Sequence, residues 1–209
     1  MSPFTFAMTH KQTSKSQQRQ LRKALCKKRQ ALSEAERRLA TSQISQIIQT
    51  ANFFKRSRHI ACYWAVNGEV DLWSVIEKAW SMDKTCYLPV VDTLGANKLW
   101  FAPFTRGSKL NYNRFGILEP RAAKRHWVRA QSLDLVLTPL VAFDMDGNRL
   151  GMGGGFYDRT LAFLNRRQCW IKPHVIGIGY EFQKTTGLIR QPWDVPLHGV
   201  VTPDNLYLK

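Results

Sequence analysis

Acidic residues are scarce in this sequence, which has 15 Asp and Glu against 31 Lys and Arg and a formal net charge of +16. No apolar run approaches the roughly 18 to 20 residues that cross a bilayer, and the first residues lack the apolar core of a secretory signal. The four cysteines form no C-x-x-C pair, which argues against a zinc site or a disulfide framework. We therefore expect a soluble, cytoplasmic protein without a membrane partner.

The sequence also lacks the usual fingerprints of nucleotide and metal sites. No Lys-Ser or Lys-Thr follows its glycines as Walker A requires, Phe156 stands where a dinucleotide pattern begun at Gly151 needs glycine, and H-E-x-x-H is absent. The five histidines show no ligand spacing. A metal ion would therefore be held by carboxylates, and Mg²⁺ that accompanies phosphates fits that chemistry best.

Alternating apolar patterns predict an α/β fold. Short apolar runs typical of strands occupy residues 59–65, 85–91, 98–102, 133–143, 174–180 and 198–203. Helical patterns precede or separate them: a basic helix over 17–33, a second helix with a capping box at Ser33 and Glu36, and a third that starts after Asp71. We predict one domain over residues 18–209, a layered sandwich with a largely parallel central sheet flanked by helices, behind a polar tail of residues 1–17.

Glycines cluster directly after the run 133–143. The segment "GNRLGMGGGFYDRTL", residues 147–161, contains five glycines, and four of them fall within residues 151–155. A turn needs one or two glycines, so this density favours a backbone that closely approaches a ligand. A helical pattern begins at Phe156, and Arg149 and Arg159 add positive charge, so the loop is suited to phosphate. A purely structural turn is the alternative.

Four aspartates are candidates for binding a cation, namely Asp144, Asp146, Asp158 and Asp194. Asp144 and Asp146 lie in the turn-like stretch "FDMDGN", where acids most often cap turns. Asp158 stands at the start of the helix beside the glycines, and it therefore ranks above them.

Positive charge is concentrated near the N-terminus, where the first 60 residues carry 13 Lys and Arg but two acids. In "QQRQLRKALCKKRQALS", Leu21, Leu25 and Leu32 form an apolar stripe surrounded by basic residues. Three interpretations remain open: a solvated surface helix, a nucleic-acid surface, or a site for anionic small molecules such as polyphosphates. The nucleic-acid interpretation is disfavoured because no aromatic residues alternate with the basic residues of this segment.

Several motifs together resemble the 5-formyltetrahydrofolate cyclo-ligase, or methenyltetrahydrofolate synthetase, family. They are "QLR", "NGEVD", "YLPVV", "RFGILEP", "TPLVAFDMDGNRLGMGGGFYDRTL" and "WDVPLHGVVTP", in family order from about residue 18 to the C-terminus. The resemblance implies a small cytoplasmic enzyme that converts 5-formyltetrahydrofolate into 5,10-methenyltetrahydrofolate, using ATP and Mg²⁺ and releasing ADP and phosphate. It implies phosphorylation of the formyl oxygen and attack by N10 of the folate.

The resemblance also implies site residues. The ATP site would contain Gln18, Arg19, Arg22, Arg149, Leu150, Gly151, Met152, Gly153, Gly154, Gly155, Phe156 and Tyr157. The folate site would contain Trp64, Glu69, Phe115, Met152, Gly153, Gly154, Gly155 and Phe156. Asp158 and Asp194 would bind Mg²⁺, and Arg149, Tyr157 and Asp158 would be catalytic. We expect a monomer that binds no nucleic acid, with folate polyglutamates as further candidate substrates.

The sequence departs from the family pattern at a few positions. Gln18 stands where a lysine is common, which makes Lys15 or Arg19 the candidate replacement. Gly154 replaces a lysine of some members, Phe156 replaces a first tyrosine, and His198 stands where an acid is common. We expect altered affinity rather than lost chemistry. Two rival functions remain: a basic protein that binds RNA or a membrane surface, and a sugar-phosphate enzyme of related architecture.

Overall fold

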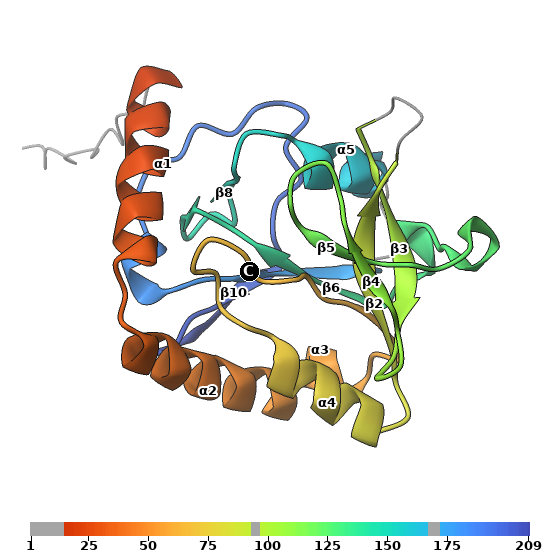
Figure 1. Ribbon diagram of the computed structural model, residues 1–209. Helices are drawn as coiled ribbons and strands as arrows, with labels where there is room; N and C mark the ends of the chain where they lie inside the picture. The colour runs from red at the N-terminus through yellow and green to blue at the C-terminus, as the bar shows by residue number, and fades with distance from the viewer. Residues whose placement is uncertain (1–14, 93–96, 167–171) are drawn as a thin grey trace, which may run out of the picture.

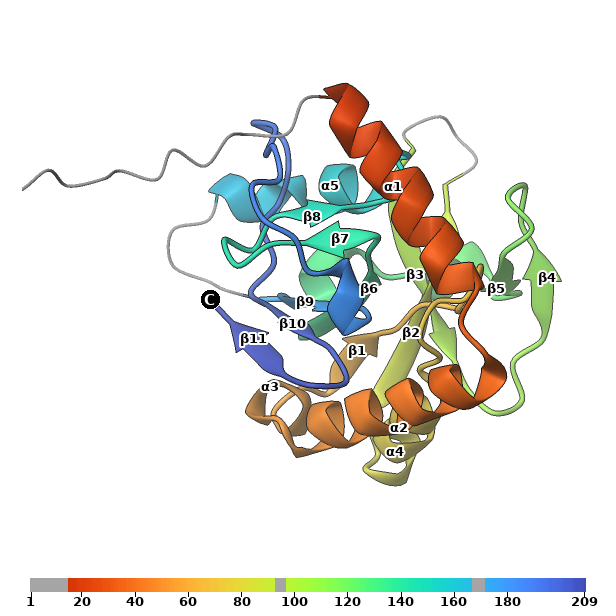
Figure 2. The same ribbon diagram turned by 90° about the vertical axis from the view of Figure 1, so that its left-hand side faces the viewer.

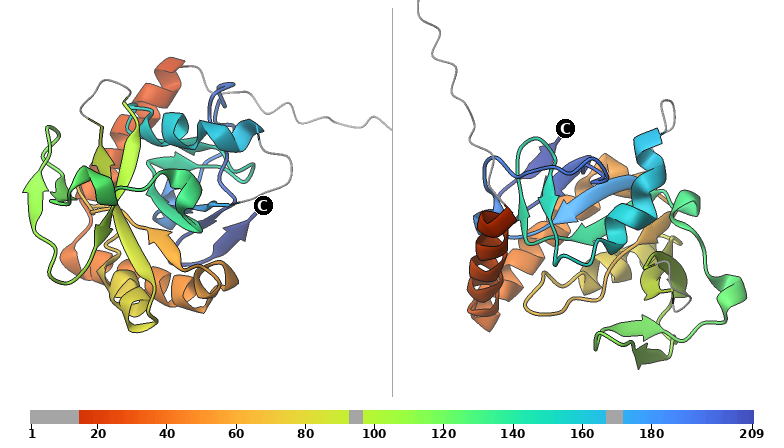
Figure 3. Two further views of the ribbon diagram at one scale, coloured as in Figure 1. Left: turned by 90° about the vertical axis from the view of Figure 1, so that its right-hand side faces the viewer. Right: turned by 90° about the horizontal axis from the view of Figure 1, so that it is seen from above.

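The computed structural model describes residues 15–92, 97–166 and 172–209, and its centre is a seven-stranded sheet of order β11-β10-β9-β6-β1-β2-β3 (Figure 1). The strands of this sheet are β1 (His59–Ala61), β2 (Thr85–Val91), β3 (Leu99–Phe104), β6 (Leu135–Pro139), β9 (His174–Ile178), β10 (Gly199–Val201) and β11 (Leu206–Leu208). The five inner strands are parallel, and β3 and β11 pair antiparallel at opposite edges (Figure 3). The predicted largely parallel sheet is confirmed.

Helices and small hairpins cover both faces of this sheet. The α-helices are α1 (Lys15–Gln30), α2 (Glu34–Thr50), α3 (Asn52–Lys55), α4 (Trp73–Ser81) and α5 (Phe156–Leu161). The 3₁₀ helices are η1 (Lys124–His126), η2 (Ala130–Ser132), η3 (Ala162–Arg166) and η4 (Glu181–Gln183), and the hairpins are β4 (Leu110–Tyr112) with β5 (Leu118–Pro120) and β7 (Ala142–Phe143) with β8 (Arg149–Leu150). Helices α2, α3 and α4 lie under one face, whereas α5, β7 and β8 lie over the other (Figures 1 and 2). No helix in the described part of the chain is both long and apolar enough to span a membrane.

The alternation of side chains along the parallel strands divides the core into two layers. Leu135 and Leu137 of β6 pack with α2, α3 and α4 on one face, whereas Val136 packs on the opposite face with α5. Both faces are apolar because helices cover both, as a parallel sheet requires. Helix α2 starts at the predicted place, since Ser33 and Glu36 form the capping box.

Helix α1 packs apart from the other helices, against the β7–β8 hairpin (Figure 2). Leu21 and Leu25 contact a small buried cluster of Ala142, Leu150 and Leu188. The helix begins at Lys15, so residues 15–17 of the predicted tail are helical, and residues 1–14 lie outside the described residues. The apolar stripe therefore docks α1 beside the glycine loop that follows β8.

Four of the predicted strands, 59–65, 133–143, 174–180 and 198–203, are shorter in the structure, and the first two of these changes shape the site. The run 133–143 divides into β6 and β7, because Pro139 has no N–H with which to extend the ladder and Ala142–Phe143 pairs with β8 instead. The run 59–65 keeps its strand only to Ala61, and the chain then enters a loop in which Asn67 and Gly68 have positive φ. Both changes release backbone at the carboxyl edge of the sheet.

The order of the strands creates a switch point at this edge. Strand β1 pairs with β2 on one side and with β6 on the other, so the chain leaves neighbouring strands in opposite directions. In open α/β sheets, ligands bind in the crevice outside the carboxyl ends of strands at such a point.

At the opposite edge, Asp134 ties together the amino ends of neighbouring strands. Its carboxylate accepts hydrogen bonds from the backbone N–H groups of Arg58 and His59, each at 2.9 Å, and from Lys172 Nζ at 2.8 Å. Burial raises the pKa of this carboxyl, but the hydrogen bonds from Lys172 and the two N–H groups outweigh burial and hold the pKa at about 2.

We expect Asp134→Asn to lower the free energy of unfolding by about 1–2 kcal/mol at pH 7, because it removes charge-assisted hydrogen bonds. A carboxyl whose folded pKa lies below the unfolded value of about 3.9 stabilises the fold above that pH. This contribution is lost as the pH falls toward the folded pKa of about 2. Urea denaturation of wild type and variant at pH 7 and at about pH 2.5 measures this contribution. If the difference in their free energies of unfolding were as large at about pH 2.5 as at pH 7, the ionised Asp134 carboxylate would not be the source of the stability.

Candidate functional site

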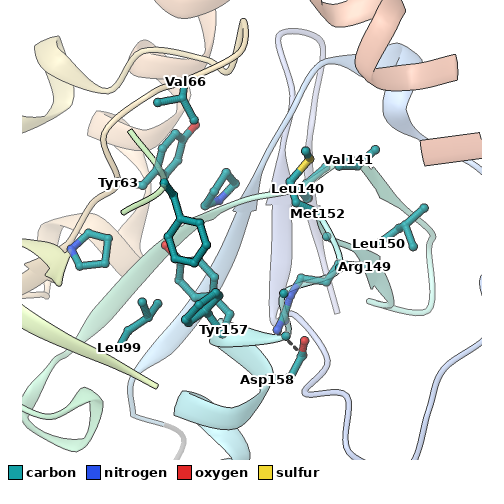
Figure 4. Close-up of a pocket in the computed structure, with 18 of the residues that line it drawn as sticks. Tyr63, Val66, Leu99, Leu140, Val141, Arg149, Leu150, Met152, Tyr157 and Asp158 are labelled. Atoms are coloured by element: carbon teal, nitrogen blue, oxygen red, sulfur yellow. Dashed lines mark hydrogen bonds and ion pairs between the residues drawn. The ribbon is translucent and has the colours of Figure 1, made fainter. Parts of the chain in front are cut away.

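A cleft of about 870 Å³ opens at the carboxyl ends of β1, β2 and β6 (Figure 4). Its walls come from the segments after these strands, from α1, from the glycine loop before α5 and from residues 189–194. The predicted site residues that line it are Gln18, Arg22, Trp64, Glu69, Phe115, Arg149, Leu150, Gly151, Met152, Gly153, Gly154, Gly155, Phe156, Tyr157, Asp158 and Asp194. The sheet topology thus brings together residues that are distant in the sequence.

Some residues considered in the sequence do not contribute to the wall of the cleft as the structure describes it. Arg19 is exposed on α1 and is not part of the wall of the cleft, so its position does not favour the ATP contact that the resemblance implies. Lys15, the other candidate replacement for a lysine at Gln18, begins α1, and its side chain lies outside the described part. His198 is also outside the cleft, where its Nδ1 accepts the N–H of Val175 at 3.0 Å.

The glycine loop is held by arginines on both sides. The Nε of Arg22 donates to the carbonyl of Gly151 at 2.8 Å, which ties α1 to the loop. Gly153 and Gly155 have φ of 98° and 61°, in the left-handed region that favours glycine. A side chain at Gly155 would also meet Arg159, since its Cβ would lie 2.8 Å from the Nη1 of that residue. The cluster therefore serves both backbone conformation and close packing of arginine.

Arg149 is fixed at the end of this loop by two neighbours. Its Nη1 donates to the carbonyl of Val195 at 2.6 Å. Its Nη2 donates to Oδ1 of Asp158 at 2.5 Å (Figure 4). The N–H of Val195 also reaches Oδ1 of Asp158, at 3.3 Å. Because the Arg149 side chain is almost fully buried, this ion pair gives Asp158 one orientation, with Oδ2 left for another partner.

Asp194 lies near Asp158 in the same wall. Its Oδ2 accepts the N–H of Gln191 at 2.8 Å. Burial raises the pKa of the Asp194 carboxyl, and the negative charge of Asp158 adds to that rise. Each carboxylate keeps one oxygen without a hydrogen-bond donor among the described residues.

This pair fits a partly hydrated Mg²⁺, which usually binds one or two carboxylates together with phosphate oxygens and water. Within the described ranges no three His, Cys, Asp or Glu side chains form a metal cluster, so a cation here would depend on ligands from its substrate. Asp144, the earlier candidate, accepts N–H groups from Asp146, Asn148 and Leu188 and caps the turn as its sequence context suggested.

The deep end of the cleft contains a buried ion pair between Glu69 and Arg29. The Nη1 of Arg29 lies 3.6 Å from Oε1 of Glu69, and the Glu69 Oε2 accepts the N–H of Val66 at 3.2 Å. Burial raises the pKa of the Glu69 carboxyl, while the Arg29 charge partly opposes the rise. Glu69 is therefore a carboxylate in an apolar place, able to accept hydrogen bonds from a ligand.

Arg29 was not singled out from the sequence, where it appeared as one more charge on a basic helix. It is 2% exposed, and its guanidinium donates to the carbonyls of Asn67, at 3.0 Å, and Leu140, at 3.3 Å. Its Nη2 has no partner among the described residues. The sequence does indicate that Arg29 faces the interior, since it falls on the same helical stripe as Leu21, Leu25 and Leu32.

Tyr157 points into the cleft from the first turn of α5 (Figure 4). Burial raises the pKa of its hydroxyl, and the negative charge of Glu69 raises it further. The hydroxyl therefore stays protonated at neutral pH and is able to donate a hydrogen bond.

Aromatic residues form the mouth of the cleft. The rings of Phe115 and Phe156 meet edge to face with centroids 5.6 Å apart, and Phe115 is 53% exposed. Glu119 was missed in the sequence although it stands in the quoted "RFGILEP"; it accepts the Val91 N–H at 2.9 Å and Asn113 Nδ2 at 2.7 Å. Glu119 thereby holds the hairpin that presents Phe115.

Replacing Arg29 by leucine should cost about 3–5 kcal/mol of folding stability, because the carboxylate of Glu69 would be left buried without its partner. Lys27→Leu, a change at an exposed position on the same helix, is the control and should shift stability by about 0.5 kcal/mol or less. Adding Glu69→Gln to Arg29→Leu should restore part of the loss. Equal stability for Arg29→Leu and Lys27→Leu in urea denaturation would disprove the pairing.

Comparisons with known proteins identify the family of this chain. The model of the 5-formyltetrahydrofolate cyclo-ligase family matches residues 14–203. The 5-formyltetrahydrofolate cyclo-ligases of Haemophilus influenzae and Escherichia coli K12 are 34% and 36% identical to this chain, over 87% and 86% of it and 95% and 97% of their own lengths. The structure of Aquifex aeolicus 5,10-methenyltetrahydrofolate synthetase superimposes with a TM-score of 0.76 at 33% identity, covering 91% of this chain and 92% of that one. The chain therefore belongs to the 5-formyltetrahydrofolate cyclo-ligase family.

Proposed function

We propose that this protein converts 5-formyltetrahydrofolate into 5,10-methenyltetrahydrofolate, with ATP cleaved to ADP and phosphate. The observation that supports this most is that one cleft contains two complementary ends. One end has a glycine loop, Arg22, and the carboxylates of Asp158 and Asp194, which suit a nucleotide polyphosphate with Mg²⁺. The other end has the buried carboxylate of Glu69 near aromatic side chains, which suits a flat heterocycle with N–H donors.

The chemistry explains why both ends must share one cleft. A formyl group on nitrogen is an amide, so its carbon is a poor electrophile and its oxygen a poor leaving group. Transfer of the terminal phosphoryl group to the formyl oxygen makes that oxygen part of a good leaving group. The folate N10 then attacks the formyl carbon, the C–O bond breaks, phosphate departs with the former formyl oxygen, and the N10 proton passes to solvent. Since N10 belongs to the same molecule, the substrate supplies this proximity.

The residues near α1 and the loop would bind ATP. The Nε of Arg22 is bound to the carbonyl of Gly151, so the two other nitrogens of its guanidinium could bind a phosphate. This phosphate would lie over Gly153, which is close to Arg22: a Cβ on Gly153 would be 3.9 Å from Arg22 Cζ. Gln18 lies one helical turn away and donates to the carbonyl of Ile189 at 3.2 Å, so it would contribute by closing the cleft. Arg149 would supply positive charge and hold Asp158 in place.

Asp158 and Asp194 would hold Mg²⁺ through the two oxygens that lack donors. When bound, the ion would neutralise charge on the phosphates during transfer. The Arg149 ion pair keeps Asp158 from turning away, and the N–H of Gln191 holds the other oxygen of Asp194.

The folate ring would lie at the Glu69 end. Glu69 accepts hydrogen bonds from the amino and ring N–H groups of the pterin, while Trp64 and Phe115 contact its flat faces. Tyr157 is placed between the two ends, and its protonated hydroxyl would donate toward charge that develops as the formyl oxygen is phosphorylated.

We also propose that the protein acts in the cytoplasm. The described cysteines Cys26, Cys62 and Cys86 are free thiols, which suits a reducing compartment. The monomeric state expected from the resemblance stays a prediction.

Wild-type protein mixed with 5-formyltetrahydrofolate, ATP and Mg²⁺ should form the methenyl product, followed by its absorbance, and omission of ATP should abolish it. Asp158→Asn should lower kcat by about 100-fold or more, because the cation and Arg149 lose their shared carboxylate. Asp146→Asn is the matched control, since Asp146 is exposed and outside the cleft. Thermal denaturation checks that both variants are folded. Equal rates for the two folded variants would contradict the role of Asp158. If the wild type formed no product, the proposed function would be contradicted.

The KM for 5-formyltetrahydrofolate at saturating ATP should rise as the pH falls from 7 toward about 5. Burial raises the pKa of Glu69 above the ordinary glutamate value of about 4.3, so its carboxylate is protonated, and loses acceptor capacity, at a higher pH than usual. Glu69→Gln should raise KM at pH 7 about tenfold and flatten its pH dependence. If KM changed with pH in the same way for the wild type and for Glu69→Gln, protonation of Glu69 would not be the cause of the rise in KM.

A further inference from the structure

Arg29 is almost fully buried, yet its partners do not use all of its donors. Its Nε donates to the carbonyl of Asn67 at 3.0 Å and its Nη1 to that of Leu140 at 3.3 Å, whereas Nη2 has no partner among the described residues. A buried N–H group without an acceptor costs free energy. The fold therefore keeps an arginine at this position at a cost.

The two carbonyls do not explain the charge of this side chain. They need N–H donors, which a neutral amide side chain also supplies. The charge of Arg29 is matched by Glu69, whose Oε1 lies 3.6 Å from Nη1, and both side chains are more than nine-tenths buried. An apolar pair of similar volume often stabilises a fold as well as a buried ion pair does. A costly ion pair beside a cleft therefore indicates a role in binding.

Three tyrosines also lie within electrostatic reach of Glu69, namely Tyr63 after β1, Tyr157 of α5 and Tyr180 after β9. Burial raises the pKa of each phenol, and the negative charge of Glu69 adds to the rise, so all three stay neutral at neutral pH. Arg29, from α1, is the one cation of the described residues whose charge acts on Glu69. It lowers the pKa of the Glu69 carboxyl, which burial raises.

Arg29 acts on the cleft through Glu69. Glu69 lines the cleft, whereas Arg29 is not among the residues of its wall. An ionised carboxylate only accepts hydrogen bonds, but a protonated one donates a hydrogen bond as well. The ionisation of Glu69 therefore decides whether this end of the cleft requires two N–H donors on one edge of the ligand or tolerates an edge with one donor and one acceptor.

We propose that Arg29 is a positioning residue that keeps Glu69 ionised, so that the deep end of the cleft selects ligands with two adjacent N–H donors. This inference rests on the proposed function, in which the amino and ring N–H groups of the pterin meet Glu69. Arg29 also holds the loop before Glu69, through the carbonyl of Asn67. Removal of its charge should therefore weaken folate binding and leave the ATP end unchanged.

The test measures the Kd of 5-formyltetrahydrofolate without ATP, from about pH 5 to about pH 8, by quenching of tryptophan fluorescence. Arg29→Gln keeps amide donors for the carbonyls but removes the charge. It should raise Kd at pH 7 about tenfold and make binding weaken at a higher pH than in wild type. Arg29→Lys keeps the charge and should stay within about threefold of wild type. The KM for ATP should change in neither variant.

Lys27→Gln is the matched control, because it removes the same charge from an exposed position of the same helix. It should leave Kd and its pH dependence unchanged. If Kd depended on pH in the same way in Arg29→Gln, Lys27→Gln and wild type, Arg29 would not set the ionisation of Glu69.

A double variant shows whether Arg29 acts through Glu69. Arg29→Gln combined with Glu69→Gln should bind no more weakly than Glu69→Gln alone, with the same flat pH dependence. A further loss of binding would overturn the proposal, because Arg29 would then act by another route. If Arg29→Gln is too unstable to fold, this double variant and Arg29→Lys carry the test. A folded Arg29→Lys protein that binds as weakly as Glu69→Gln also overturns the proposal.

An analogue tests the selection of donors. The 2-desamino-2-methyl analogue of 5-formyltetrahydrofolate lacks the amino donor, and wild type should bind it at least about tenfold more weakly than the parent compound. The gap should shrink in Arg29→Gln, because a protonated Glu69 no longer requires both donors. An equal gap in both proteins would contradict the proposed selection.

Because these measurements need no turnover, they separate this proposal from the reaction itself. If wild type and variants bind in the expected pattern but wild type forms no methenyl product, the proposed reaction fails and the role of Arg29 stands. If product forms but Kd and its pH dependence are the same in wild type and in Arg29→Gln, the positioning role fails alone.

Discussion

The organisation of the cleft depends on the attachment of α1 by side chains that donate to backbone carbonyls of the loops around it. Arg29 reaches the carbonyls of Asn67 and Leu140, Arg22 reaches Gly151, and Gln18 reaches Ile189. Loops after parallel strands have carbonyls with no partner in the sheet, and a buried carbonyl without a donor is costly. The helix supplies these donors, so residues close to the N-terminus set the positions of loops that follow strands far along the chain.

This attachment gives the high positive charge of the N-terminal region two different roles. Arg29 is buried and neutralises Glu69, so its charge acts on the interior and adds little to the surface field. Arg22 remains at the wall of the cleft, where its charge meets the glycine loop. One helix therefore docks through leucines, pairs one arginine internally and presents another to the cleft.

Much of this site could be predicted from local sequence patterns, and the rest could not for identifiable reasons. The glycine cluster and Asp158 are adjacent in the sequence, so their proximity needs no knowledge of the fold. The pairing of Arg29 with Glu69 joins a helix to a loop after β1, and only packing decides it. The end of β6 at Pro139 could not be predicted, because the whole apolar run 133–143 has the pattern of a single strand. Only the pairing of Ala142 with Leu150 of β8 shows that the run contains two strands.

In the proposed reaction, the phosphate end and the folate end of one cleft place the terminal phosphate of ATP against the formyl oxygen. The most direct test is to label that oxygen with ¹⁸O in 5-formyltetrahydrofolate and to examine the phosphate released during turnover by ³¹P NMR. We expect the label in inorganic phosphate, because the formyl oxygen departs with the phosphoryl group. Unlabelled phosphate, with the label in water instead, would contradict the arrangement of the two ends.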